Sequence, residues 1–206
     1  ESIYYFGKLF SQVHDIKIDF SCTDSGEEIT GLKYSSFDCI VSNLPFGMKI
    51  PYYRDRNRSY MEFSMHIISE SIKRLNDTGR AVFLVNDGIL FSRSKEAVVF
   101  RKEIINSGTL MCVISLPSKS LTNTQVKSSI LVFDKKNYKS KVQFIDATTD
   151  EFYEVNPDKS ISLNVNKIIS DISWQFENLP NNVNEPELAY GQKANKLFVT
   201  IPEFRR

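Results

Sequence analysis

The segment FDCIVSNLPFG, residues 37–47, decides the fold of this chain. Its first half is an apolar run, which is typical of a buried strand. The run ends abruptly in an amide, a proline and an aromatic ring, at Asn43, Pro45 and Phe46. We therefore interpret the segment as a buried strand whose carboxyl end carries the reactive groups of a functional site.

Further strands and helices alternate along the chain after this segment. Apolar runs at residues 80–86 and 110–115 predict strands, and apolar residues at helical spacing predict helices from Met61 to Leu75 and from about Lys95 to Ile105. A continuous apolar run such as residues 80–86 is typical of a strand covered on both faces of a parallel sheet. The alternation therefore predicts a doubly wound α/β sheet.

The remaining segments predict elements at the edges of this sheet. Strand-like runs at residues 129–133 and 142–146 are too close in sequence for a helix between them, which predicts an antiparallel hairpin. Upstream, the pattern predicts a helix over residues 2–13 that packs one apolar face, and a strand over residues 16–20. Beyond residue 148 the pattern weakens. Residues 161–174 could hold one helix, and residues 179–186 are typical of a linker.

Composition indicates one hydrophobic core and no strong electrostatic field. The 206 residues are 41% hydrophobic with a net charge of +1, so a nucleic-acid surface would have to be a local patch. Cys22, Cys39 and Cys112 have the spacing of neither a zinc site nor a disulfide framework, which favours a reducing cytoplasm. Neither histidine has a partner that suggests a metal. Without an apolar window of membrane-spanning length or a signal peptide, we expect a soluble intracellular protein.

The residues that end the central strand place two hydrogen-bond acceptors beside a flat ring. Pro45 fixes its own φ and holds Leu44 extended, so the Asn43 amide oxygen and the Leu44 carbonyl lie side by side. Phe46 adds an aromatic face, and Gly47 allows close approach. Two acceptors that pull an amino nitrogen toward tetrahedral geometry make it nucleophilic. The arrangement fits methylation of a nucleobase amine that has left the duplex and stacks on the ring, worth roughly 1–3 kcal/mol per base.

Each of these features also has a purely structural explanation. A strand-to-loop turn with a buried phenylalanine would contain the same four residues. Asp24 follows the predicted strand over residues 16–20, where it either binds a ligand or makes a local turn. Residues 49–58 are expected to form a polar, basic loop, in which Arg54, Arg56 and Arg58 either contact phosphates or are solvated.

The ordered set of segments resembles one protein family. FDCIVSNLPFG is followed by GRAVFLVNDGILF at residues 79–91, and then by Leu116-Pro117, LTNT at 121–124, ILVFDK at 130–135 and VQFIDA at 142–147. In this order and approximate spacing, they resemble the adenine-specific DNA methyltransferase (M) subunit of type I restriction-modification systems. The resemblance covers about residues 1–147.

The resemblance implies roles for the four residues of the tetrapeptide. Asn43 and the Leu44 carbonyl would accept hydrogen bonds from the adenine amino group. Pro45 completes the catalytic tetrapeptide, and Phe46 would stack on the base. Leu44 stands where the family usually has a first proline, which keeps the carbonyl acceptor but holds it less rigidly.

The resemblance also implies contacts outside the tetrapeptide. Asp24 matches the acidic position that contacts the adenine moiety of S-adenosylmethionine in similar enzymes, and Thr124 lies in a segment that usually lines the target-base pocket. No glycine-rich turn that would bind the methionine part of the cofactor precedes Asp24. We therefore expect an N-terminally truncated methyltransferase whose sheet has an unpaired edge beside residues 37–43.

In full, the resemblance implies a partial Rossmann-like, S-adenosylmethionine-dependent methyltransferase sheet with a C-terminal antiparallel edge hairpin. We expect a partial catalytic domain over residues 1–147 and a partly helical extension with an irregular arm over 148–206. The expected function is the catalytic portion of an N6-adenine DNA methyltransferase, inactive as this fragment, acting on double-stranded DNA together with specificity and restriction subunits. A methyltransferase for protein glutamine or ribosomal RNA, and a non-catalytic interaction module, remain alternatives.

Overall fold

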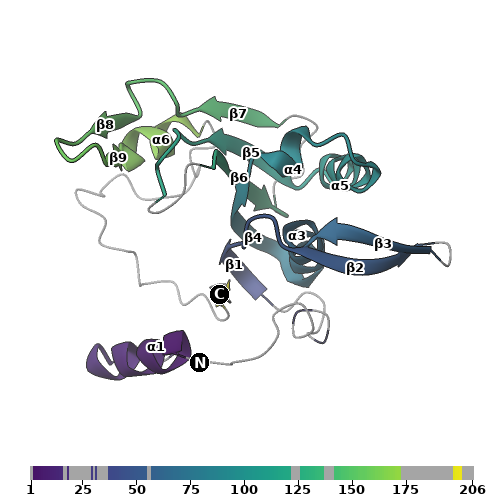
Figure 1. The fold of residues 1–206 in the computed structure, drawn as a ribbon. Coiled ribbons are helices and arrows are strands. Elements are labelled where there is room, and N and C mark those ends of the chain that lie inside the picture. Colours follow the sequence, from purple (N-terminus) through teal and green to yellow (C-terminus); the bar gives the residue numbers. More distant parts are fainter. Residues whose placement is uncertain are drawn as a thin grey trace.

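The computed structural model describes residues 2–15, 18, 29, 31, 37–54, 57–121, 126–136, 142–172 and 197–200, without the side chains of residues 2–4, 6, 52–59 and 197–200. Helices and strands alternate along it (Figure 1). In chain order they are α1 (Ser2–Val13), β1 (Phe37–Asn43), β2 (Lys49–Arg54), β3 (Asn57–Glu62), α3 (Phe63–Arg74), β4 (Leu75–Asn86), α4 (Gly88–Phe91), α5 (Lys95–Asn106), β5 (Leu110–Ser115), β6 (Ser128–Asp134), β7 (Gln143–Asp146), β8 (Tyr153–Val155), β9 (Ile161–Leu163), α6 (Val165–Asp171) and β10 (Leu197–Thr200).

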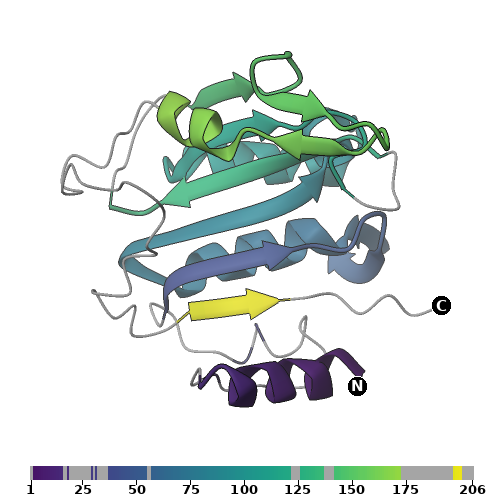
Figure 2. The same ribbon diagram turned by 90° about the vertical axis from the view of Figure 1, so that its left-hand side faces the viewer.

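A six-stranded sheet forms the centre of the fold, in the order β10-β1-β4-β6-β5-β7. β1 runs parallel to both β4 and β10, and β5 runs parallel to β7, whereas β6 is antiparallel to β4 and β5 (Figure 2). The mostly parallel sheet confirms the predicted α/β fold. It also places the carboxyl ends of β1, β4, β5 and β7 at one edge, where ligands bind in such sheets.

The strands predicted to pair as an edge hairpin, β6 and β7, are not neighbours. β5 lies between them, with Ile114 opposite Ile130 of β6 on one side and Ile145 of β7 on the other. The short link between the two strands requires that they run in opposite directions, but it does not require that they pair. A few residues are long enough to pass one intervening strand, because neighbouring strands are only about 5 Å apart. A C-terminal antiparallel hairpin is present, but it is formed by β8 and β9.

Three further expectations differ from the structure. The basic loop expected at residues 49–58 is the β2–β3 hairpin, with Tyr53 opposite Arg58. The helix expected from Met61 to Leu75 is shorter, because α3 runs from Phe63 to Arg74, Met61 belongs to β3 and Leu75 begins β4. The edge of β1 that was expected to be unpaired carries β10.

The two faces of the sheet carry separate hydrophobic clusters. On one face, α3 and α5 pack against β1, β4 and β6 and bury residues such as Ile40, Phe83 and Phe133 (Figure 1). On the other face, Phe152 and Ile168 bring the β8–β9 and α6 region against β5 and β7. Residues 148–172 therefore share a core with the sheet.

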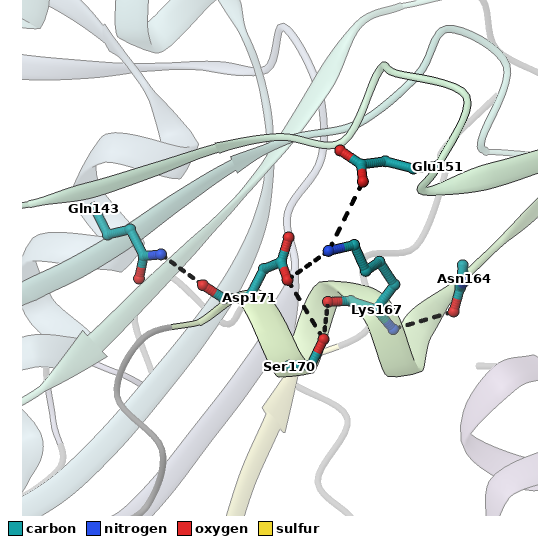
Figure 3. A network of polar contacts seen from close by, with 6 residues as sticks. All are labelled: Gln143, Glu151, Asn164, Lys167, Ser170 and Asp171. Carbon is teal, nitrogen blue, oxygen red and sulfur yellow. Dashed lines mark hydrogen bonds and ion pairs between the residues drawn. The ribbon is translucent and has the colours of Figure 1, made fainter.

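α6 is fastened to the edge strand β7 by polar contacts (Figure 3). The Gln143 side-chain amide donates to the Asp171 backbone carbonyl at 2.6 Å. Lys167 lies 2.8 Å from the Asp171 carboxylate and 3.8 Å from that of Glu151. The hydrogen bond to Asp171 raises the pKa of Lys167. The Gln143 contact ties the end of α6 to β7, and the ion pair with Glu151 ties the same helix to the turn before β8.

α1 forms as predicted, but its apolar face is not packed. Tyr5, Leu9 and Val13 lie a turn apart and are 67%, 59% and 71% exposed. The expectation that this helix buries one apolar face is therefore wrong for the described part of the chain. Among the described residues, no helix is long and apolar enough to cross a membrane.

Replacing Phe83 with alanine tests the first cluster. Phe83 is fully buried on β4 and meets Phe133 of β6 edge to face, with ring centroids 5.8 Å apart. We expect Phe83→Ala to lower the free energy of unfolding by about 3–5 kcal/mol, measured by urea denaturation. Phe144→Ala is the matched control, because Phe144 is 75% exposed on β7 and should cost less than about 1 kcal/mol. Equal losses would contradict the assignment of the core.

Candidate active site

The loop that follows β1 is fixed at both ends. At its start, the Leu44 amide donates to the Leu84 carbonyl of β4 at 3.2 Å, and the Leu44 side chain is buried at 3% exposure. At its end, the Met48 carbonyl accepts from the Phe63 amide at the first residue of α3, at 2.8 Å. Gly47 turns the chain between them with a φ of +71°, which favours glycine. The loop therefore has a defined path.

This loop presents the predicted tetrapeptide at the carboxyl ends of the strands. The Asn43 side chain is exposed, whereas Pro45 and Phe46 are half-buried. Because the Leu44 amide and side chain are both held, the direction of its carbonyl is restricted as well. The arrangement leaves an amide acceptor and part of an aromatic ring accessible beside a fixed backbone segment. Such a surface can hold a planar ring that carries an amino group.

The end of β4 is held by a second set of contacts. The Asn86 side-chain amide donates to the Glu62 carboxylate at 3.2 Å, and the Ser64 hydroxyl donates to the same oxygen at 3.4 Å. A Cβ on Gly88 would come within 2.6 Å of Asn86 Oδ1, so only glycine fits here without movement. Glu62 ends β3, and its carboxylate therefore joins the hairpin to the sheet edge.

The neighbouring strand β6 joins the same edge. The Asp87 carboxylate accepts from the Ser129 hydroxyl at 2.6 Å, and the Asp87 amide donates to the Lys127 carbonyl at 3.0 Å. The Leu116 amide donates to the Ser128 carbonyl at 2.9 Å, which ties the loop after β5 to the start of β6. The loops that follow β1, β4 and β5 thus meet at one edge of the sheet.

Three ionisable groups on the strands of the sheet have shifted pKa values. Burial raises the pKa of the Cys39 thiol on β1, although the Arg80 charge opposes this, and burial raises the pKa of Cys112 to about 11. Both thiols are therefore protonated near neutral pH and unsuited to nucleophilic attack. Hydrogen bonds from Thr148 lower the pKa of Asp146 at the end of β7. Among the described residues, no cluster of three or more potential ligands could hold a metal ion.

The structure places some of the predicted site residues and not others. Asn43, Leu44, Pro45 and Phe46 lie at the end of β1, where Asn43 is exposed, Pro45 and Phe46 are half-buried and Leu44 is buried. Arg54 ends β2 and Arg58 lies on β3, both toward the tip of the hairpin rather than in a loop. The remaining predicted contacts lie outside the described residues, namely Asp24, Arg56 and Thr124.

Sequence reasoning missed the contacts that fix this edge. Glu62 and Asn86 are 24 residues apart, and only the fold shows that their side chains meet. The glycine after Asn86-Asp87 is visible in the sequence, but nothing local shows that the Asn86 side chain approaches it. The close approach of Asn86 to Gly88 gives that glycine its structural reason.

The fold and the exposed tetrapeptide at the strand ends define an α/β protein of the methyltransferase class. A sequence profile of the family N-6 DNA Methylase matches residues 7–182. Because the match spans most of the chain, the chain belongs to this family.

Individual proteins of known name are similar to parts of the chain. The type I restriction enzyme HindI methylase subunit of Haemophilus influenzae is 31% identical over 81 residues, which cover 39% of this chain and 18% of that protein. The type I restriction enzyme MpnII methylase subunit of Mycoplasma pneumoniae is 30% identical over 151 residues, covering 66% of this chain and 27% of that protein. The chain thus spans less than a third of the length of these curated relatives.

Solved structures share the fold. The type I restriction-modification system methyltransferase subunit from Streptococcus thermophilus superposes with a TM-score of 0.70 at 19% identity, covering 82% of this chain and 40% of that chain. The type I restriction enzyme EcoKI M protein gives a TM-score of 0.51 at 18% identity, covering 65% of this chain and 30% of that chain. At these identities, the superpositions establish the fold alone.

A double-mutant cycle tests the contact at the end of β4. Gly88→Ala forces the Asn86 side chain away from Glu62 and should destabilise the protein by about 1–3 kcal/mol, measured by urea denaturation. In an Asn86→Ala background, the same substitution should be neutral or stabilising, because alanine is the better helix former at the start of α4. An equal cost in both backgrounds would contradict the proposed clash.

Proposed function

We propose that this chain forms the base-holding part of an N6-adenine DNA methyltransferase of a type I restriction-modification system. The observation that carries the proposal is the clamped loop at the end of β1, which exposes Asn43 beside Phe46 on a fixed backbone. Membership of a DNA methylase family and two curated relatives that are type I methylase subunits support it. They do not favour protein glutamine or ribosomal RNA as substrate, or a non-catalytic module.

The residues of the tetrapeptide would act on the adenine amino group. Asn43 Oδ1 and the Leu44 carbonyl oxygen accept its two N–H groups, and Phe46 stacks on the ring of the flipped base. The nitrogen lone pair is thereby withdrawn from the ring and directed at the incoming methyl carbon. Transfer would form one N–C bond as the carbon–sulfur bond of the methyl donor breaks, and the amine would then release one proton to solvent. No thiolate or metal ion is required from the chain.

S-adenosylmethionine, when bound, would supply the electrophilic methyl group. Asn43 is exposed at the carboxyl ends of the strands, which is where such sheets bind ligands. A methyl donor bound there would lie beside the amine that Asn43 holds. On this proposal, Asp24 contacts the adenine moiety of the cofactor and Thr124 lines the target-base pocket. What the tetrapeptide contributes is positioning of the amine for direct displacement, which is a large part of catalysis in such transfers.

Double-stranded DNA is the proposed substrate, and specificity and restriction subunits are the proposed partners, in the cytoplasm. The near-neutral charge of the chain agrees with a catalytic part that leaves target recognition to another subunit. The boundary at residue 147 between a catalytic domain and an extension stays a prediction, as do the individual site residues.

Substitution of Asn43 tests the proposed chemistry. We expect Asn43→Ala to reduce methyl transfer from labelled S-adenosylmethionine to adenine-containing duplex DNA by at least about 100-fold, since it removes an acceptor used in the transition state. The assay uses the chain alone and the chain joined to the preceding part of the Mycoplasma pneumoniae relative.

Two controls accompany this substitution. DNA affinity should stay within about twofold of the unaltered protein, because Asn43 does not contact phosphates. Asn106→Ala at the end of α5 removes an exposed amide far from β1 in sequence and should leave transfer unchanged. Unchanged transfer in Asn43→Ala, in a protein that is otherwise active, would refute the assigned role.

A further inference from the structure

The loop that follows β1 and carries the tetrapeptide is attached to β4 at two points. At its start, the Leu44 amide donates to the Leu84 carbonyl at 3.2 Å. Two residues further along the same strand, the Asn86 side-chain amide donates to the Glu62 carboxylate at 3.2 Å. Glu62 is the last residue of β3, and the hairpin ladder places it opposite Lys49, the residue directly after the loop. β4 therefore holds the start of the loop directly and its end through Glu62.

The residue after Glu62 completes this attachment. The Phe63 amide donates to the carbonyl of Met48, the last residue of the loop, at 2.8 Å. The Phe63 side chain is buried at 6% exposure in the cluster between α3 and the sheet. The amide that holds Met48 belongs to the peptide unit that joins Glu62 to Phe63, so a shift of Glu62 moves it. The position of Glu62 thus determines where the loop ends.

The Glu62 carboxylate serves this contact and not its own helix. Glu62 is the N-cap residue of α3, where a side-chain oxygen often accepts from the first backbone amides of the helix. Within the part of the chain that the structure describes, it makes no such cap hydrogen bond. Its Oε2 accepts instead from the Asn86 amide and, at 3.4 Å, from the Ser64 hydroxyl. The side chain therefore fixes β3 and α3 relative to β4.

We propose that Glu62 is a positioning residue for methyl transfer, which acts by holding the far end of the loop that carries the two acceptors. The inference rests on the proposed function, because it takes Asn43 and the Leu44 carbonyl as the groups that hold the amine. A misplacement of reacting groups by about 1 Å can cost about 100-fold in rate. Release of Glu62 from Asn86 frees one end of the loop while the Leu44 contact stays. Transfer then slows, although DNA still binds.

Steady-state kinetics of two Glu62 variants separate positioning from binding. Methyl transfer to duplex DNA is measured with the chain joined to the preceding part of the Mycoplasma pneumoniae relative. We expect Glu62→Ala to lower kcat by about 10–100-fold and to leave KM for DNA within about twofold. Glu62→Gln keeps an oxygen that accepts from Asn86 and should retain kcat within about threefold. Equal losses in the two variants would overturn the proposal, and so would a raised KM with unchanged kcat.

Asn86→Ala tests the same contact from its other side. It removes the donor to Glu62 and should lower kcat about as much as Glu62→Ala does. Because each substitution breaks the same contact, the double variant should be no slower than either single variant, within about twofold. Losses that multiply in the double variant would mean that the two residues act independently, which contradicts the proposal.

Two control variants exclude a general loss of stability. Gln143→Ala removes the hydrogen bond to the Asp171 carbonyl at the opposite edge of the sheet, and Glu103→Ala removes an exposed carboxylate on α5. Both should keep kcat and KM within about twofold. The unfolding midpoint of every variant is measured, and the assay temperature is set well below the lowest of them. A loss of kcat in Gln143→Ala equal to that in Glu62→Ala would overturn the specific role of Glu62.

Amide hydrogen exchange, followed by NMR, tests the restraint in the chain by itself. Glu62→Ala should speed exchange of the Phe63 amide at least about tenfold, because the bond to Met48 opens more often, while exchange of the Ile114 amide in the sheet stays unchanged. Unchanged exchange at Phe63 would overturn the positioning role whatever the activity. If the unaltered joined protein transfers no methyl group, the proposed function fails, and exchange at Phe63 still decides whether Glu62 holds the loop.

Discussion

The hydrogen bond from the Leu44 amide to the Leu84 carbonyl is the contact on which the proposed active site depends. It continues the parallel ladder between β1 and β4 by one step beyond Asn43. Since β4 is itself paired on its other side by β6, Leu84 has little freedom to move. The start of the loop that carries the candidate acceptors is therefore restrained by the middle of the sheet, although the loop lies at the surface.

The elements that could be predicted from the sequence are those whose signal is local. β1, β5 and α5 each have a continuous apolar run or a helical repeat, and the structure confirms them. The start of β4 could not be read in this way, because residues 76–79 are Asn, Asp, Thr and Gly, which disfavour strands. Tertiary contacts hold them in the strand: the Asn76 side-chain amide donates to the Asp38 carboxylate, and the Lys135 amide donates to the Gly79 carbonyl at 3.0 Å.

The order of the strands and the details of the site were less predictable for a related reason. The length of the link between two strands does not specify whether they are neighbours in the sheet. β5 could therefore lie between β6 and β7 without any local signal in the sequence. Likewise, the tetrapeptide was visible as a sequence motif, whereas the Glu62–Asn86 contact that supports its surroundings exists only after α3 and β4 have folded. Motifs identify reactive groups, and long-range contacts determine how those groups are held.

Leu44 illustrates how the two levels combine. Proline at this position would lock φ through its ring, but it has no amide hydrogen to donate. Leucine lacks that restriction on φ. In this fold its position is fixed in two other ways: its amide donates to the Leu84 carbonyl, and its side chain is buried at 3% exposure. The sequence alone suggested that Leu44 loosens the acceptor pair. The structure shows that the position is held by the sheet instead of by a ring, so a carbonyl acceptor at this position does not depend on proline.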